Sequence, residues 1–213
     1  FTQSLPIGFC MRDEQSDLLE EVESDFASVQ LAFDVDSEQV YPVAAEVLST
    51  ITAGNDDSML FQALREEQAL VAEIESQISR VGQFSRLVIR YDVRSEWLKD
   101  TLTKVFAYLH RLTMYVRPAR LNQLRTQFTT NNAMLTDDTA ALNDRLGWAW
   151  MSGDTAQADL DAAAAQYNEL TAEELLDAAQ TVFRPENLSI AVQYDPAAVG
   201  DLRPLLQKLR ETL

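Results

Sequence analysis

Two pairs of neighbouring carboxylates come nearest, in type and spacing, to the residues that catalysis needs. Glu73 and Glu75 would share one face of a strand, where they could act as an acid–base pair or as metal ligands. Glu66 and Glu67 form the second pair, directly after Arg65. Nothing near either pair would keep one carboxylate protonated while the other stays ionised. We therefore interpret both pairs as solvated surface, and Arg65 as a salt-bridge partner within its run with Glu66 and Glu67.

The sequence contains a single histidine, His110, and a single cysteine, Cys10. Together they cannot supply the ligands of a Cys₄, Cys₂His₂ or His₃ zinc site, and one cysteine cannot form an internal disulfide. No His, Cys, Asp or Glu stands three or four residues from His110, so we interpret it as a surface or core-edge histidine. Cys10 lies in an apolar segment without a neighbouring base, which favours a small hydrophobic role over a nucleophilic one.

The composition restricts the partners. The 213 residues include 17 Lys and Arg and 34 Asp and Glu, for a formal net charge of −17, which excludes the basic face of a duplex-binding protein. No segment approaches the roughly 20 apolar residues of a membrane span, and the apolar start at Phe1 lacks a basic leader. We expect no nucleic acid partner, no membrane partner and a cytoplasmic location. The spread of acidic residues favours a solvated surface; an acidic cleft for basic peptides is the alternative.

Hydrophobic periodicity predicts the elements that position these residues. Alternation predicts strands over 28–35, 72–78, 87–91 and 188–194, with a hairpin turn over 80–83. Helical spacing predicts helices over 37–53, from 57 to 64, from 95 to 112, from 118 to 150 with a break near 136–138, over 159–167 and from 171. This order predicts a single α+β domain over 26–213, a largely antiparallel sheet packed against several long helices. Residues 1–25 are predicted as a linker or N-terminal extension, with a linker or short exposed helix over 13–25.

Three segments resemble the pitrilysin/insulinase family of zinc metallopeptidases, which includes the mitochondrial processing peptidases. The first is the strand VQLAF at 29–33 with the helix that ends at Ala53 and Gly54. The second is SMLFQALREE at 58–67, and the third is LTAEEL at 170–175 leading to FRPENL at 183–188. Their order and spacing carry the resemblance, which extends from Phe26 to Tyr194.

Members of that family have two related lobes that close on a peptide like a clamshell, and the resemblance implies that this chain is one lobe. The N-terminal lobe holds zinc through the motif His-x-x-Glu-His and a distant Glu, and the motif Glu acts as general base toward the metal-bound water. With one histidine, this sequence lacks the motif. By resemblance it is the C-terminal, non-metal lobe, inactive in isolation. Zinc would come from an N-terminal lobe in the same or another chain, and a homodimer is one assembly that this allows.

The resemblance also implies a residue that contacts the peptide substrate. In the C-terminal lobes of active members, an Arg and a Tyr seven residues later reach across the cleft to the bound peptide, where they can stabilise the developing oxyanion. Arg65 matches the Arg, which implies a substrate-binding role. Ala72 stands at the place of the Tyr, in the segment ALVA where the family commonly has Gly-Leu-Ala-Tyr. Met59 stands where the family has a basic residue after the serine that starts the helix.

Two functions therefore stay open at the level of the sequence. The first is the substrate-enclosing C-terminal lobe of a zinc-dependent metalloendopeptidase that acts on peptides. The alternative, which Ala72 and Met59 favour, is a non-catalytic scaffold or substrate-capture subunit homologous to the peptidases. The sequence upstream of Phe1 separates the two, since an intact His-x-x-Glu-His there indicates the first function and a degenerate motif the second.

Overall fold

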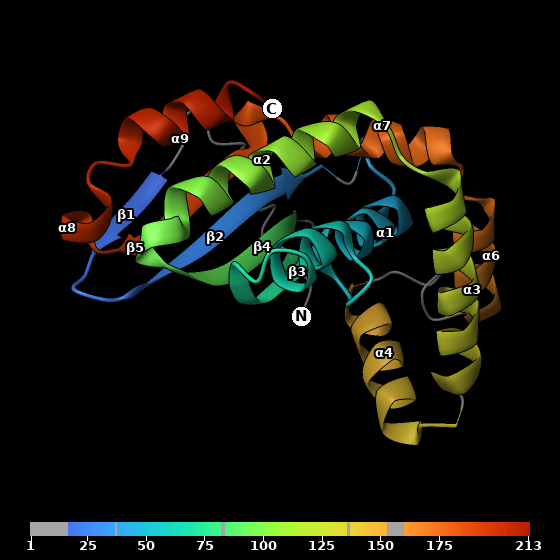
Figure 1. Ribbon diagram of the computed structural model, residues 1–213. Helices are drawn as coiled ribbons and strands as arrows, with labels where there is room; N and C mark the ends of the chain where they lie inside the picture. The colour runs from blue at the N-terminus through green and yellow to red at the C-terminus, as the bar shows by residue number, and fades with distance from the viewer. Residues whose placement is uncertain (1–16, 37, 82–83, 136, 153–159) are drawn as a thin grey trace, which may run out of the picture.

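The computed structural model describes residues 17–36, 38–81, 84–135, 137–152 and 160–213. Within these residues a five-stranded mixed sheet packs against helices, and further helices extend beyond one end of it (Figure 1). In spatial order the strands are β1 (Asp17–Glu21), β5 (Leu188–Tyr194), β2 (Phe26–Val35), β4 (Phe84–Arg94) and β3 (Val71–Val81). The helices are α1 (Pro42–Ala53), η1 (Phe61–Glu66), η2 (Ser95–Trp97), α2 (Leu98–Met114), α3 (Pro118–Leu135), α4 (Thr139–Ser152), α6 (Leu160–Glu169), α7 (Ala172–Val182), η3 (Pro185–Asn187), α8 (Pro196–Val199) and α9 (Arg203–Arg210).

Alternation of apolar and polar residues gives the sheet one covered face and one open face. β4 pairs antiparallel with β2 and β3, β5 pairs antiparallel with β2, and β1 pairs parallel with β5. Val29, Leu31 and Phe33 of β2 are buried in the core with residues of α1, α2 and α7, whereas Ser28 and Arg90 on the other face are exposed. The predicted α+β fold with a largely antiparallel sheet is therefore confirmed.

β1 corrects the prediction for the residues that precede the first apolar strand. A linker or short exposed helix over 13–25 is wrong for Asp17–Glu21, because these residues form a strand parallel to β5. The mostly exposed, acidic residues of β1 carry no alternating signal. The strand forms because β5 offers it unpaired backbone hydrogen-bonding groups. The sheet thus includes part of the segment predicted as a linker or N-terminal extension.

A buried arginine secures β1 to the end of the chain. The side chain of Arg210, in the last turn of α9, is 6% exposed. Its guanidinium donates hydrogen bonds to the carbonyl oxygens of Pro185 (3.1 Å) and Leu188 (2.7 Å) and to the carboxylate of Asp17. One side chain therefore joins α9, the start of β5 and the start of β1.

Helices α3, α4 and α6 form a helical arm beyond the sheet (Figure 1). α3 ends at Leu135 and α4 begins at Thr139, which confirms the predicted break. At the base of the arm, the ring of Phe128 stacks on that of Tyr167 with centroids 4.3 Å apart. The Tyr167 hydroxyl donates to the carboxylate of Glu46 in α1. The arm is thus anchored to the helices that cover the sheet.

Some predictions fall on residues that are not described. Cys10 and the rest of residues 1–16 are among them, as are Ser37, at the predicted start of the first helix, and residues 82–83 of the predicted hairpin turn. The flanking strands β3 and β4 pair through Val81 and Phe84, as the hairpin requires.

Tyr91 places a polar group in the core of the sheet. Its side chain lies on the covered face of β4, and its hydroxyl has no hydrogen-bond partner among the described residues. Burial raises the pKa of Tyr91 far above its usual value of 10.0, because the ionised phenolate would lose its hydration.

We expect Tyr91→Phe to raise the free energy of unfolding at neutral pH by about 1 kcal/mol, since it removes an unsatisfied buried hydroxyl. Above about pH 10 the unfolded chain releases the Tyr91 proton and the folded chain keeps it. The free energy of unfolding of the wild type should therefore fall by about 1.4 kcal/mol per pH unit through this residue. The Tyr91→Phe protein should lack this contribution to the pH dependence. Urea unfolding as a function of pH measures both effects. Tyr41→Phe, at a residue 74% exposed, should change neither; a less stable Tyr91→Phe protein would contradict the prediction.

Candidate functional site

Arg65 lies in a π-helix that leads into the edge strand β3. The sequence predicts a helix here, and the structure shows that Phe61–Glu66 is wound more widely than an α-helix. The hydrogen bond from the amide of Glu67 to the carbonyl of Gln62, at 2.9 Å, spans five residues. π-helical turns are rare and occur frequently at functional sites, because the extra residue turns the side chains that follow it to new directions.

The side chain of Arg65 is 43% exposed and rests on an aromatic ring. Its guanidinium carbon lies 4.7 Å from the centroid of the buried Phe61 ring, a cation–π contact that holds the group in place. The expected salt bridge to Glu66 is present, at 3.9 Å from Nε, but both groups are exposed and the pair contributes little to stability. The guanidinium donates no hydrogen bond to any residue that the structure describes, so its N–H groups are available to a ligand.

A strained residue ends the π-helix and directs the chain into β3. Ala69 has φ 50°, in the left-handed region that favours glycine. Its amide donates to the carbonyl of Arg65 (3.0 Å), and the amide of Leu70 donates to the carbonyl of Leu64 (2.8 Å). These bonds satisfy the last carbonyls of the helix, as a C-terminal cap does.

Ala69→Gly is expected to raise the free energy of unfolding by about 0.5–1 kcal/mol. A left-handed alanine costs roughly 1–2 kcal/mol, and the greater freedom of glycine in the unfolded chain offsets part of that gain. Chemical denaturation measures the change. The matched control is Ala107→Gly, at an exposed position inside α2, which should lower stability by about 1 kcal/mol. Losses of equal size at both positions would contradict the role given to Ala69.

Ala72 lies in a β-bulge at the start of β3. Val71 pairs with Val93 and Ile74 pairs with Tyr91, so two residues of β3 face a single residue of β4. The alternation predicted over 72–78 places Ala72 on the same face as Ile74. This is wrong because the bulge shifts the alternation: Ala72 is exposed and Ile74 is buried. The position that resembles the family Tyr therefore carries only a methyl group, at the exposed start of an edge strand.

Glu73 and Glu75 lie on the open face of the sheet beside basic and polar groups. The carboxylate of Glu75 is 4.0 Å from Arg90, whose Nε donates to the side chain of Gln30 at 3.0 Å. Residues of β1, β5, β2, β4 and β3 line a shallow hollow of about 440 Å³ here. A cross-strand ion pair on a solvated face agrees with the interpretation that these carboxylates are solvated surface groups.

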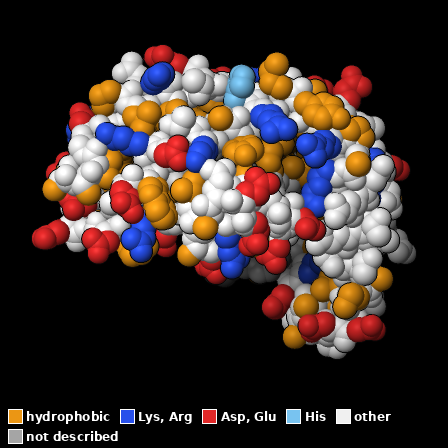
Figure 2. Space-filling model, viewed as in Figure 1, with side chains coloured by type: hydrophobic (Ala, Val, Ile, Leu, Met, Phe, Trp, Pro, Cys, Tyr) orange, Lys and Arg blue, Asp and Glu red, His pale blue; other side chains and the backbone are white. Residues whose placement is uncertain are grey.

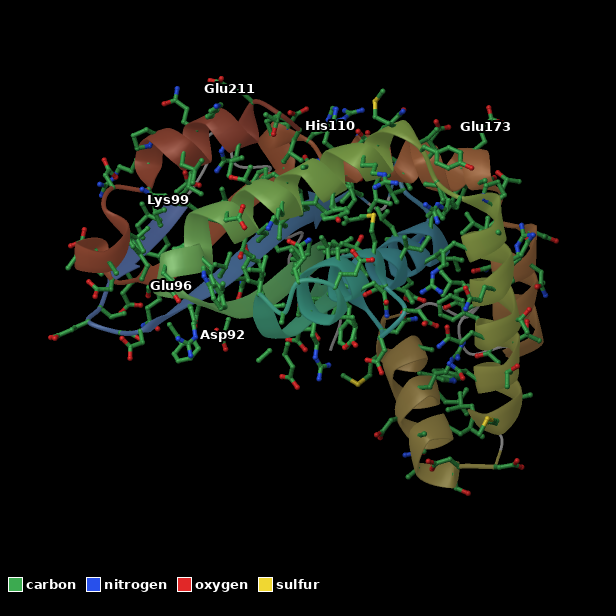
Figure 3. The ribbon with its side chains drawn as sticks, in the orientation of Figure 1. Asp92, Glu96, Lys99, His110, Glu173 and Glu211 are labelled. Atoms are coloured by element: carbon green, nitrogen blue, oxygen red, sulfur yellow. The ribbon has the colours of Figure 1, made fainter. Side chains whose placement is uncertain are left out.

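The remaining candidates lie apart from this face. His110 is exposed on the outer side of α2 (Figure 3), Glu66 and Glu67 are exposed, and Met59 packs partly buried against the core. In the described ranges no three His, Cys, Asp or Glu side chains gather as metal ligands would. The helices of the same ranges include none long and apolar enough to cross a membrane.

A family model identifies the family of this chain, and solved structures share its fold. The sequence model of the peptidase M16 inactive domain matches residues 8–128, more than half of the chain. The peptidase M16 inactive domain of Pseudomonas fluorescens has a similar structure, with a TM-score of 0.73 at 19% identity over 87% of this chain and 45% of that one. A protease from Helicobacter pylori matches with a TM-score of 0.76 at 14% identity over 91% of this chain and 48% of its own.

A candidate zinc protease from Bordetella pertussis matches with a TM-score of 0.62 at 16% identity, over 78% of this chain and 93% of its own. No curated protein sequence matches the chain. At these identities the structural matches show the fold alone. The chain spans less than half of the length of the Pseudomonas and Helicobacter proteins.

Proposed function

Since this chain belongs to the peptidase M16 family, as its inactive domain, we propose that it is the substrate-enclosing C-terminal lobe of a zinc-dependent metalloendopeptidase that acts on peptides. The observation that carries the proposal is Arg65. The position that resembles the substrate-facing arginine of the family holds a guanidinium that is half-exposed, supported by Phe61 and only weakly paired. Such a group is ready to bind a peptide carbonyl.

Zinc, in this proposal, belongs to the N-terminal lobe, in the same chain or in another. The donor set of this chain does not fit a catalytic zinc site, because it has one histidine and the described residues bring no ligands together. The half of the Pseudomonas and Helicobacter proteins that this chain does not match leaves room for a separate zinc-bearing part, and the name of the Bordetella relative associates zinc with a protein of this fold. A homodimer is one assembly that would bring the lobes together.

The chemistry left to this lobe is recognition and charge stabilisation. Arg65 would donate hydrogen bonds to the carbonyl of the bound peptide, and these strengthen as negative charge develops on that oxygen. Ala72 offers no hydroxyl for a second hydrogen bond. The arginine would therefore act without the phenol that accompanies it in the family pattern.

We expect residues 1–213 alone to show no zinc-dependent peptide cleavage. Addition of the N-terminal lobe should restore cleavage, and a metal chelator should abolish it. A quenched fluorescent peptide library measures the rates, with the intact protein as the positive control. Cleavage by the isolated chain in the presence of zinc would overturn the assignment of the zinc to another lobe.

The alternative is a non-catalytic scaffold or substrate-capture subunit. Ala72 and Met59 favour it, because both replace side chains that the family pattern uses. Under this alternative the assembled protein binds peptides without cleaving them, and the segment upstream of Phe1 carries a degenerate zinc motif.

A further inference from the structure

A basic groove lies on the helical side of the molecule, next to η1. It has a volume of about 540 Å³. The residues that precede η1, the C-terminal part of α2 and the N-terminal end of α3 form its walls. We call it the arginine groove after three of its lining residues, Arg111, Arg117 and Arg120; Asp57 and Glu67 are its acidic residues. Figure 2 shows Lys and Arg side chains gathered where α2 and α3 meet. A local excess of positive charge contrasts with the net charge of −17 of the chain.

The three arginines differ in how firmly they are held. Arg120 is fixed: its side chain is 16% exposed, and its guanidinium donates to Asn55 (3.1 Å) and Gln123 (2.8 Å) and lies 3.8 Å from Asp57. Burial lowers the pKa of Arg120, and Asp57 opposes that shift. Arg111 and Arg117 are exposed, and their guanidinium groups form no ion pair with a described residue. They are therefore free to pair with an external anion.

The backbone adds to the positive potential of the arginine groove. Arg117 directly precedes α3, a helix of 18 residues with no acidic residue in its first turn. The positive end of the helix dipole attracts negative charge, and no acidic side chain in the first turn offsets it. The contribution comes from the dipole, because Pro118 has no N–H and the amides of Arg120 and Leu121 donate to the carbonyl of Arg117.

A buried hydroxyl and two phenol rings complete the lining of the arginine groove. Ser58 is fully buried, lines the groove, and its Oγ has no hydrogen-bond partner in the described part of the chain. An unsatisfied buried hydroxyl is unfavourable, so a ligand oxygen that reached it would be stabilised. Tyr108 and Tyr115 line the same groove, and Tyr115 is 60% exposed. Such amphipathic rings suit a polypeptide that brings apolar as well as charged groups.

We propose that the arginine groove binds an acidic segment of a polypeptide, whose Asp or Glu carboxylates pair with Arg111 and Arg117 and enter toward Arg120 and Ser58. Arginine pairs with carboxylates in a bidentate geometry, which gives orientation as well as charge. The volume exceeds what an inorganic anion fills and lies in the range of organic ligand sites. A nucleic acid carries charge along its whole length and would meet the acidic remainder of the chain, whereas a short acidic segment can end within the groove. This proposal does not rest on the peptidase function, because it uses neither Arg65 nor zinc.

Fluorescence anisotropy with a labelled, short Asp- and Glu-rich peptide containing leucine tests the proposal on the intact protein. The comparison probe is the same peptide with Asn and Gln in place of the acids. We expect binding of the acidic peptide only, with an affinity that falls as salt increases. Arg111→Gln and Arg117→Gln should each weaken it about fivefold. Ser58→Ala should also weaken it.

Lys99→Gln is the matched control, since Lys99 is an exposed cation at the other end of α2 (Figure 3) and does not line the groove. It should leave the affinity unchanged, and circular dichroism should show that all variants fold. Equal binding of the amide peptide, an unchanged affinity in both arginine variants, or displacement by inorganic phosphate as strong as by the peptide would overturn the proposal.

Discussion

Arg210→Met is expected to lower the free energy of unfolding by about 3 kcal/mol. Methionine keeps much of the volume but donates no hydrogen bond, so the carbonyl oxygens of Pro185 and Leu188 and the carboxylate of Asp17 lose their partner. Each buried acceptor left unsatisfied costs about 1–3 kcal/mol, and a broken buried ion pair costs more than an exposed one. Because Asp17 is partly exposed, water restores some of its hydration. Urea unfolding followed by circular dichroism gives the change.

The control for this prediction is Arg203→Met in the same helix. The side chain of Arg203 is 69% exposed and lies 3.3 Å from the carboxylate of Asp201, which is also exposed. Its loss should change stability by no more than about 0.5 kcal/mol. Asp17→Asn should cost less than Arg210→Met, since the two carbonyl bonds remain. Equal losses for the Arg210 and Arg203 variants would show that the buried network does not secure β1.

Under the proposed function, Arg65→Ala in the assembly with the zinc-bearing lobe is expected to lower kcat/KM by about 100-fold. Removal of one donor that stabilises an oxyanion costs about 10²–10³ in rate. Most of the loss should appear in kcat, since the interaction strengthens in the transition state. Arg65→Lys should recover part of the activity, because an ammonium keeps the charge but not the planar pair of donors. Steady-state kinetics with a fluorogenic peptide separate kcat from KM.

Arg184→Ala provides the comparison for Arg65. Arg184 is an exposed arginine in the turn after α7, and its Nε donates to the carbonyl of Gln180 (2.8 Å). The Arg184→Ala substitution removes the same charge far from η1, and it should leave kcat/KM within about twofold of the wild-type value. An Arg65→Ala enzyme with wild-type kinetics would favour the scaffold or substrate-capture alternative, and a parallel fall in both variants would indicate a general effect of charge.

The sequence predicted the covered face of the sheet because the large apolar residues there recur with a period of two. Val29, Leu31 and Phe33 alternate with Gln30 and the small Ala32, and one register alone puts all three large side chains in the core. The break between α3 and α4 was also visible. Arg65 could be identified only through the family resemblance, since an arginine before two glutamates is ordinary by itself.

The features that escaped prediction depend on contacts between distant segments. The bulge at Ala72 exists only in the pairing of β3 with β4, and the amino-acid sequence of β3 alternates as it would in a strand without a bulge. β1 has a polar sequence, and its strand conformation comes from β5 and Arg210, far along the chain. The arginine groove likewise joins the loop before η1 to the ends of α2 and α3. Short-range patterns contain no information about such junctions.

The parallel pairing of β1 with β5 has a consequence for synthesis on the ribosome. Glu20 and its partner Gln193 are 173 residues apart, so β1 leaves the ribosome long before the strand that receives it. The hairpin of β3 and β4 can join β2 early, because those contacts are closer in sequence. During the interval the β1 segment has no partner, and the acidic residues among its five, DLLEE, would disfavour pairing with a strand of another nascent chain. Part of the acidity of this protein would thus protect it before it has folded.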